Sequence, residues 1–338
     1  MPTLITIIIP TLNEVEYISC CLDSVLSSNY DSGYMEIFVV DGMSDDGTRS
    51  IVNDYIKKYP YITLLDNEDK IVPRAMNIGI QAAKGDYIIR LDAHSQFPKN
   101  YFSKLVEASV ELKADNVGAV AITDVKNKTI KSNAIIKVLS HRFGVGNSDF
   151  RTGVKNIKEV DTVPFGCFKR DVFDKYGLYD TRLVRNQDIE LNKRIKNGGG
   201  KIFLIPGVEF IYFARESFSK LYKNNYENGL WNILTAYYTD SLKSLSLRHF
   251  VPLFYILSIV VPSLLAIIEI KFLLISALSF SLHSLLLLIF SIKENSEDTS
   301  VLNLIIAFLT LHYSYGIGSV SGIFRLIKLR YFKWAEKR

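Results

Sequence analysis

Three long apolar stretches near the C-terminal end constrain the fold of this chain more than any other feature. They cover residues 250–268, 272–292 and 301–324, and each is close to the roughly 20 residues that a membrane-spanning helix needs. Only Glu269 to Lys271 separate the first two stretches, which predicts a tight helical hairpin. The third stretch contains polar residues and three glycines, which favours two crossings followed by a re-entrant or interfacial segment.

The basic excess of the chain is confined to its last fourteen residues. The formal net charge is +5, and this segment carries Arg325, Lys328, Arg330, Lys333, Lys337 and Arg338 against Glu336. The remainder is neutral, which argues against nucleic-acid binding and favours a basic cluster beside an anionic membrane surface. Two crossings would keep this tail on the same side as a cytoplasmic N-terminal domain, as basic segments prefer.

The first half of the chain alternates between strand and helix patterns. Apolar β-branched runs predict strands at 4–9, 36–40, 61–65 and 86–91. Helical spacing of apolar residues predicts helices at 14–26, 46–59 and 72–83. This alternation predicts an α/β domain with a mostly parallel sheet and helices on both faces. Ligands of such sheets bind beyond the carboxyl ends of the strands.

We expect four regions along the chain. They are an α/β domain at 1–212, a helical region at 213–249, a membrane region at 250–324 and a basic cytoplasmic tail at 325–338. In the second region Phe218, Tyr222 and Tyr226 repeat at helical spacing beside lysines. This pattern suits a helix at a membrane interface, and a surface helix packed on the domain is the equal alternative.

Cysteine content and the N-terminal residues both argue against an extracellular protein. Three cysteines are too few for a disulfide framework and indicate a reducing compartment. The start MPTLITIIIP lacks the basic region of a secretory signal, and it predicts a buried strand instead.

Four polar motifs follow one another in a fixed order. They are IPTLNE at 9–14, VVDGMSDDGT at 39–48, NIGIQAAKGDYIIRLDAH at 77–94 and NQDIELNKR at 186–194. Together they resemble the family 2 glycosyltransferases, which are inverting enzymes with the GT-A fold, and in particular the bacterial succinoglycan-type exopolysaccharide glucosyltransferases. The resemblance implies a sugar-nucleotide donor and, with the membrane region, a polyprenyl-diphosphate-linked saccharide acceptor.

The resemblance implies a nucleotide-sugar site formed by Thr11, Glu14, Asp41, Arg74 and Asp92. A carboxylate at Asp41 can accept the ring N–H of uracil, which cytosine lacks. Guanine also offers ring N–H donors, so the choice of a UDP-sugar rests on the resemblance. The structural alternative is that Asp41 only forms a turn and Arg74 is a surface residue.

Asp92-Ala93-His94 stands where the family has its Asp-x-Asp motif. A divalent cation there neutralises the leaving diphosphate as a Lewis acid. A carboxylate with an imidazole favours Mn²⁺ over Mg²⁺. The alternative is a capped turn followed by an exposed histidine.

Asp188 matches the catalytic base of the family. It is expected at the start of a helix, whose dipole keeps the carboxylate ionised, so that it can take the proton of the acceptor hydroxyl. Gln187 replaces the usual preceding Glu, and Asp188 acting only as a helix cap is the alternative. Gly166 and Cys167 match the acceptor side of the family. The motif of processive synthases is absent near 215–231, which favours addition of one sugar.

Two rival functions differ in their sequence requirements. A nucleotidyltransferase needs a glycine-rich phosphate loop after the first strand, and IPTLNEVEYI contains no glycine. A non-catalytic sugar-nucleotide-binding subunit of an assembly complex is compatible with Gln187, but retention of both Asp92 and Asp188 argues against it.

Overall fold

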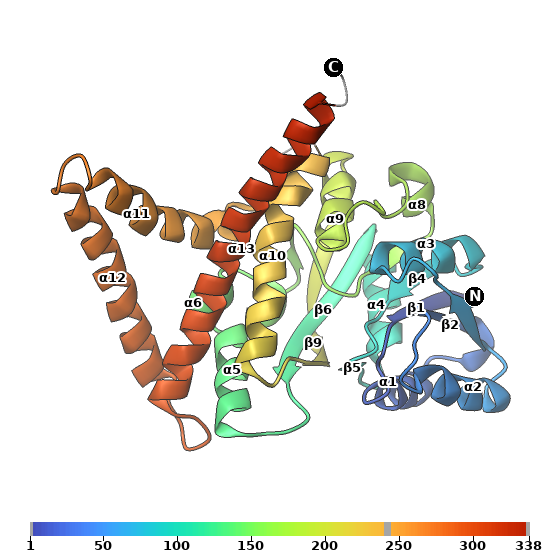
Figure 1. Cartoon of the computed structure of the whole chain (residues 1–338). Coiled ribbons are helices and arrows are strands. Elements are labelled where there is room, and N and C mark those ends of the chain that lie inside the picture. Colours follow the sequence, from blue (N-terminus) through green and yellow to red (C-terminus); the bar gives the residue numbers. More distant parts are fainter. Residues whose placement is uncertain (1–2, 240–244, 336–338) are drawn as a thin grey trace. The chain divides into compact units, whose positions relative to one another are not determined.

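The computed structural model describes residues 3–239 and 245–335, which form two compact units. The first unit comprises Met1–Ile122 and Asp149–Phe213, and the second comprises Thr123–Ser148 and Ala214–Arg338 (Figure 1). These units are defined by packing, and their boundaries do not test the four regions expected from the sequence. The four regions therefore stay a prediction. Residues 240–244 of the second region and 336–338 of the basic tail lie outside the described residues.

A mixed sheet forms the centre of the first unit. Its strand order is β3-β2-β1-β4-β8-β6-β9-β5, and β7 pairs with β9. The parallel strands are β1 (Ile5–Thr11), β2 (Met35–Asp41), β3 (Ile62–Asp66) and β4 (Tyr87–Arg90). The other strands are β5 (Ser95–Gln96), β6 (Asn116–Asp124), β7 (Lys158–Glu159), β8 (Cys167–Lys169) and β9 (Ile202–Phe213). β8 runs antiparallel to both β4 and β6.

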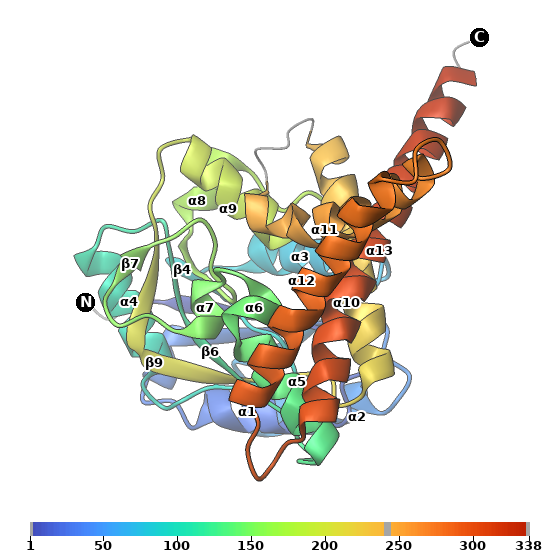
Figure 2. The same ribbon diagram turned by 90° about the vertical axis from the view of Figure 1, so that its left-hand side faces the viewer.

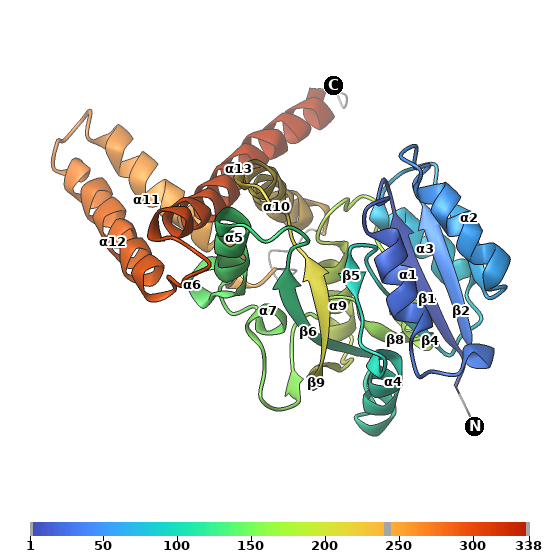
Figure 3. The ribbon, with the colours of Figure 1, turned by 90° about the horizontal axis from the view of Figure 1, so that it is seen from below.

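Helices cover both faces of the parallel strands, as the alternating pattern predicts. On one face, Ile5, Ile7 and Ile9 pack with α1 (Ile18–Leu26), α2 (Thr48–Lys58) and α4 (Tyr101–Glu111). On the other, Ile8 packs with α3 (Val72–Ala82), α8 (Asp171–Tyr176) and α9 (Gln187–Asn197). The switch of face follows from the two-residue period of a strand. Figure 3 shows α1 beside β1.

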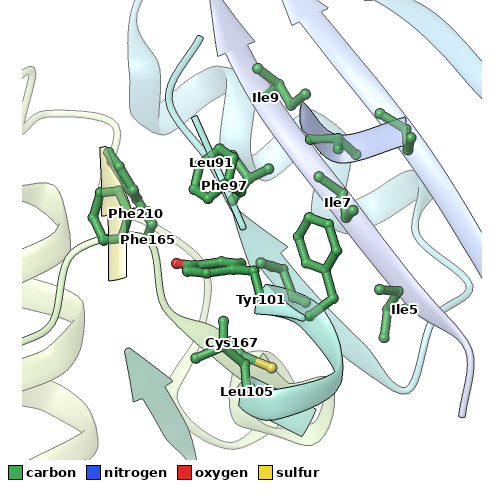
Figure 4. Close-up of a cluster of buried hydrophobic side chains, with 14 of the residues drawn as sticks. Ile5, Ile7, Ile9, Leu91, Phe97, Tyr101, Leu105, Phe165, Cys167 and Phe210 are labelled. Carbon is green, nitrogen blue, oxygen red and sulfur yellow. The ribbon is translucent and has the colours of Figure 1, made fainter. Parts of the chain in front are cut away.

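An aromatic core anchors the loop that follows β4. Phe97, Tyr101, Phe165 and Phe210 gather there (Figure 4), and the rings of Phe165 and Phe210 are 4.9 Å apart. Leu91 is fully buried in the same cluster. Because Leu91 and Phe97 are buried on either side of residues 92–96, the backbone of this polar loop has fixed ends.

Helices form the second unit. Its helices are α5 (Ile130–Ser140), α6 (Arg142–Val145), α10 (Phe218–Tyr238), η3 (Leu247–Phe250), α11 (Val251–Leu265), α12 (Phe272–Lys293) and α13 (Val301–Ala335). Within the described residues, three helical segments are long and apolar enough to cross a membrane: Leu247–Leu265, Phe272–Lys293 and Val301–Leu329. The predicted hairpin of the first two is present, and α12 runs alongside α13 (Figure 2).

The re-entrant form predicted for the third segment is wrong, and the interfacial form stays a prediction. α13 is one uninterrupted helix of 35 residues, about 50 Å long at 1.5 Å per residue. Its polar residues are used in internal contacts, which is why they do not break the helix. His312 donates through Nε2 to the carbonyl of Phe143 at 2.9 Å and accepts from His283 at 3.0 Å. The helix also extends through the first part of the predicted basic tail, residues 325–335.

Glycines bring α10 and α13 into backbone contact. A Cβ atom on Gly229 would overlap the carbonyl oxygen of Tyr315, and one on Gly318 would overlap that of Tyr226. Ser319 Oγ donates to the carbonyl of Gly229 at 3.2 Å. Small residues allow such close helix packing in apolar surroundings. The region predicted as interfacial therefore packs on the third apolar helix.

Candidate active site

The first two strands end side by side in two candidate ligand-binding residues. Thr11 of β1 is the register partner of Asp41 of β2, and both are buried. The following loops are tied together, because Asn13 N–H donates to Ser44 Oγ at 2.8 Å and Asn13 Oδ1 accepts from Asp45 N–H at 3.1 Å. The parallel strands thus place Thr11 and Asp41 at the carboxyl edge of the sheet.

Arg49 and Ser44 hold the carboxylate of Asp41. Oδ2 accepts from Arg49 Nη1 and from the Ser44 N–H, each at 2.8 Å, and Oδ1 accepts from Ser44 Oγ at 2.5 Å. Arg49 also pairs with Asp66 at 2.8 Å. The hydrogen bonds to Asp41 and then Asp66 raise the pKa of Arg49. A cation in the first turn of α2 opposes the helix dipole, and these two carboxylates offset that cost.

Glu14 lies against the candidate metal ligand His94. Glu14 Oε1 is 3.0 Å from His94 Nδ1, and both side chains are mostly buried. Burial alone would lower the pKa of His94. Tyr212, the hydrogen bond to Glu14 and the charge of Asp92 outweigh burial and raise this pKa to about 10. The imidazole therefore carries a proton at neutral pH in the absence of a metal, and metal binding must displace it.

Arg90 pairs with Asp92, and its pKa also responds to the charge of Asp188. It ends β4, is 8% exposed, and its Nη2 lies 3.2 Å from Asp92 Oδ1. Burial lowers the pKa of Arg90, but the charges of Asp92 and then Asp188 outweigh it and raise the pKa above its usual value. Among residues 3–239 and 245–335, its buried Nε has no hydrogen-bond partner, and neither has Gln187 Oε1, next to Asp188 in the sequence. Asp92 therefore pairs with a buried cation whose pKa also responds to the charge of Asp188.

Left-handed backbone is concentrated in the loops around this site. Asn13, Met43 and Lys70 follow β1, β2 and β3 with φ of 54°, 60° and 58°. Phe165 and Asn186 precede β8 and α9 with φ of 46° and 60°. Non-glycine residues adopt this conformation at a cost of order 1–3 kcal/mol, and such strain is typical of functional sites. It is a second, independent indication of a site at this edge.

Asp188 lies in the first turn of α9, as predicted. The N-cap position belongs to Asn186, and one carboxylate oxygen of Asp188 accepts from the Ile189 N–H at 2.9 Å. The side chain remains partly exposed.

Three further predicted residues have less direct positions. Arg74 is about half exposed and pairs with Asp69 at 2.6 Å; Arg49 contacts Asp41 instead. The side chain of Cys167 is fully buried in the core, where burial raises its pKa. The thiol is therefore enclosed by the core, and the acceptor-side role of this segment, which was assigned to its backbone, stays a prediction. The Gly166 carbonyl accepts from the Arg90 N–H at 3.2 Å, and its acceptor-side role stays a prediction.

Asp92 and His94 fit a metal that is shared with a ligand. Within residues 3–239 and 245–335, no group of three or more His, Cys, Asp and Glu side chains forms a metal site by itself. Asp92 Oδ1 faces Arg90, and the contact of His94 Nδ1 with Glu14 leaves Nε2 for coordination. Divalent cations at diphosphate sites commonly take one or two protein ligands and complete their shell with phosphate oxygens and water.

The profile of the family described as "Glycosyl transferase family 2" matches residues 6–177. The match covers β1 to α8 and includes the residues from Thr11 to Gly166 described above. It extends over half of the chain. The chain therefore belongs to glycosyl transferase family 2 and is a glycosyltransferase.

Two relatives and one solved structure agree with this assignment. The Methanococcus voltae dolichyl N-acetyl-alpha-D-glucosaminyl phosphate 3-beta-D-2,3-diacetamido-2,3-dideoxy-beta-D-glucuronosyltransferase is 29% identical over 81% of this chain and 86% of its own length. The succinoglycan biosynthesis protein ExoA of Rhizobium meliloti is 29% identical over 64% of this chain and 65% of its own length, which confirms the predicted resemblance. The Pyrobaculum calidifontis mannosyltransferase PcManGT, solved with GDP-Man and Mn²⁺, superposes with a TM-score of 0.59 at 15% identity, covering 94% of this chain and 88% of its own. The fold is thus GT-A, followed by apolar helices.

Proposed function

We propose that this glycosyltransferase transfers one sugar, with inversion, from a UDP-sugar to a polyprenyl-diphosphate-linked saccharide in cell-surface or exopolysaccharide biosynthesis. The observation that carries the proposal is the pairing of Asp92 with the buried Arg90 at 3.2 Å and of His94 with Glu14 at 3.0 Å after two neighbouring parallel strands; the charge of Asp188 also acts on Arg90. A carboxylate for the proton of the acceptor and a carboxylate–imidazole pair for the diphosphate are the groups that the reaction needs.

In this mechanism Asp188 accepts the proton of the acceptor hydroxyl. The oxygen of that hydroxyl attacks the anomeric carbon, and the bond from that carbon to the diphosphate breaks. A single displacement inverts the configuration, so an α-linked donor gives a β-glycoside. Asp188 is the one carboxylate needed at this step, because a transferase does not require the flanking pair of a hydrolase.

Thr11, Asp41 and Arg74 are assigned to the nucleotide, with Asp41 receiving the ring N–H of uracil. The positioning of Asp41 by Arg49 and Ser44 supports this role, because a buried carboxylate fixed by three hydrogen bonds is preorganised for recognition. Glu14 is assigned to the same nucleotide-sugar site and also supports His94 through Oε1.

Asp92 and His94 would hold a divalent cation, with Mn²⁺ preferred over Mg²⁺ because one ligand is an imidazole. When bound, the cation neutralises charge on the leaving diphosphate. Glu14 would fix the orientation of the His94 ring through Nδ1, so that Nε2 faces the ligand.

The apolar helices support a lipid-linked acceptor at a cell membrane, with the catalytic domain on the cytoplasmic side, where nucleotide sugars are made. The name of the Methanococcus voltae relative includes a dolichyl phosphate-linked sugar, which is an acceptor of the same chemical class. Three crossings would place the C-terminal end of α13 on the opposite side from a cytoplasmic domain, whereas an interfacial α13 would keep it on the same side.

A transfer assay on the full-length protein in membranes tests the proposal. Radiolabelled UDP-sugars and GDP-mannose are offered with a lipid-linked acceptor pool, with Mn²⁺, Mg²⁺ or EDTA. We expect transfer from one UDP-sugar that stops with EDTA, and a β-linkage in the product. Nucleotide binding without transfer from any donor would favour the non-catalytic subunit, and synthesis of a sugar nucleotide from sugar phosphate would favour the nucleotidyltransferase.

A further inference from the structure

Arg151 is a half-buried cation that the mechanism above does not use. It lies in α7 (Asp149–Thr152), in the first unit. Its guanidinium carbon is 5.5 Å from the centre of the Phe150 ring and 5.5 Å from the centre of the Tyr212 ring. The guanidinium therefore rests against two aromatic residues.

Arg151 has no carboxylate partner in the part of the chain that the structure describes. Its Nη1 is enclosed and makes no hydrogen bond. The nearest acid in sequence, Asp149, is paired with Lys158 at 2.8 Å. Burial lowers the pKa of Arg151, and Tyr212 opposes this only in part.

An enclosed guanidinium nitrogen without a hydrogen-bond partner is costly to a folded protein. Cation–π contacts recover only about 0.5–2 kcal/mol. An arginine cannot escape the cost by losing its proton, since its intrinsic pKa is far above neutral. An anion from outside the chain accounts for the arrangement, and the planar fork of N–H donors matches two oxygens of a phosphate.

Arg151 lies close to the candidate active site, because both contact the same tyrosine. Tyr212, on which Arg151 rests, is also in ring contact with His94, with centroids 5.1 Å apart. Tyr212 is held in place by β9, where it is the register partner of Ser95. The candidate metal ligand and the unpaired guanidinium therefore share one aromatic neighbour.

We propose that Arg151 binds phosphate oxygens of a reactant during sugar transfer. Two reactants carry this chemistry: the diphosphate of the nucleotide sugar and the phosphate that joins the acceptor saccharide to its lipid. The inference rests on the proposed function and adds a residue that neither the four motifs nor the metal pair includes.

Two substitutions and a matched control test Arg151 in the full-length protein purified in detergent. Arg151→Met removes the charge and keeps the apolar stem, and Arg151→Lys keeps the charge without the fork. Lys155→Gln removes an exposed positive charge from the loop that follows α7. Binding is measured separately for UDP with Mn²⁺ and for a short-chain polyprenyl diphosphate, and the melting temperature of each variant is measured without ligand.

We expect Arg151→Met to weaken binding of one probe about tenfold or more, with Arg151→Lys intermediate and Lys155→Gln unchanged. Loss confined to UDP assigns the donor diphosphate, and loss confined to the polyprenyl diphosphate assigns the acceptor phosphate. The melting temperature of ligand-free Arg151→Met should not fall, because the substitution removes an enclosed N–H group that has no hydrogen-bond partner among the described residues.

A lower melting temperature with both affinities unchanged would mean that Arg151 only supports Tyr212, and the inference would be overturned. This outcome is separable from failure of the proposed function. Wild-type protein that transfers no sugar contradicts the function, whereas wild-type transfer with normal binding of both probes by Arg151→Met contradicts the inference alone.

Discussion

His94 Nδ1 and Glu14 Oε1 are 3.0 Å apart, although 80 residues separate them in the sequence. Metal-binding histidines commonly donate their second ring N–H to a carboxylate, which fixes the tautomer and the orientation of the ring. Glu14 lies in the loop after β1, and His94 lies in the loop after β4. These two strands pair in parallel. The pairing of these strands therefore creates the contact.

Glu14→Ala should weaken Mn²⁺-dependent binding of UDP by roughly 10–100-fold, because the imidazole loses the partner that orients it. Glu14→Gln should have a smaller effect, since an amide oxygen still accepts from Nδ1. Titration of Mn²⁺ in the presence of UDP measures the change. Glu111→Ala, which alters an exposed glutamate of α4, is the control. Equal Mn²⁺ affinity of Glu14→Ala and wild type would remove Glu14 from the metal site.

Arg90→Met should both destabilise the protein and stop sugar transfer. The substitution removes the cation that pairs with Asp92, and loss of one partner of a buried pair costs about 3 kcal/mol of unfolding free energy. Arg90→Lys should recover part of the stability, because it restores charge without the planar fork. Chemical denaturation and the transfer assay give the two readouts, with exposed Lys99→Met as control. Wild-type stability of Arg90→Met would show that the two carboxylates do not depend on this cation.

Much of the first unit was predictable because its parallel strands and helices are encoded locally. The predicted strand at 4–9 is observed as Ile5–Thr11, and the predicted helix at 72–83 as Val72–Ala82. The antiparallel half was not predictable. β8 has three residues, and its pairing of Cys167 with Ile89 joins segments 78 residues apart. No local pattern specifies such a pairing.

The candidate site was predictable where its residues follow strands and missed where they depend on distant partners. Thr11, Asp41 and Asp92 lie at strand ends, which periodicity locates. Arg49 was missed because it lies on α2, whereas its partners Asp41 and Asp66 lie on β2 and β3. Arg90 carried a usable signal: it is a charged residue in an apolar strand, two positions before Asp92, and residues at that spacing share one face of an extended chain.

Asp188→Asn should lower the rate of sugar transfer by about 10²–10⁴-fold, the usual contribution of a general base. UDP binding should change little, because an amide of the same shape still accepts from the Ile189 N–H. Single-turnover kinetics separate the chemical step from binding. Asp174→Asn, an exposed aspartate of α8, serves as the control. If Asp188→Asn turns over at the wild-type rate, another group takes the proton.

Gly318→Val should separate α10 from α13, because the added side chain would overlap the carbonyl oxygen of Tyr226. Overpacking of a close contact costs typically 1–3 kcal/mol, and here the obstacle is backbone, which cannot move aside as a side chain can. The melting temperature in detergent should therefore fall by several degrees.

Ile317→Val is the matched control, since Ile317 is the neighbouring residue of α13 and is 38% exposed. It alters the same helix at a position outside the glycine contacts. Gly318→Ala should lie between Gly318→Val and wild type, because even one methyl group meets the Tyr226 carbonyl. Equal melting temperatures for Gly318→Val and Ile317→Val would mean that α10 and α13 do not pack through glycine in the protein. A graded fall from wild type through Ala to Val would instead identify backbone contact as the source of their association, since the rising hydropathy along this series would by itself favour helix packing.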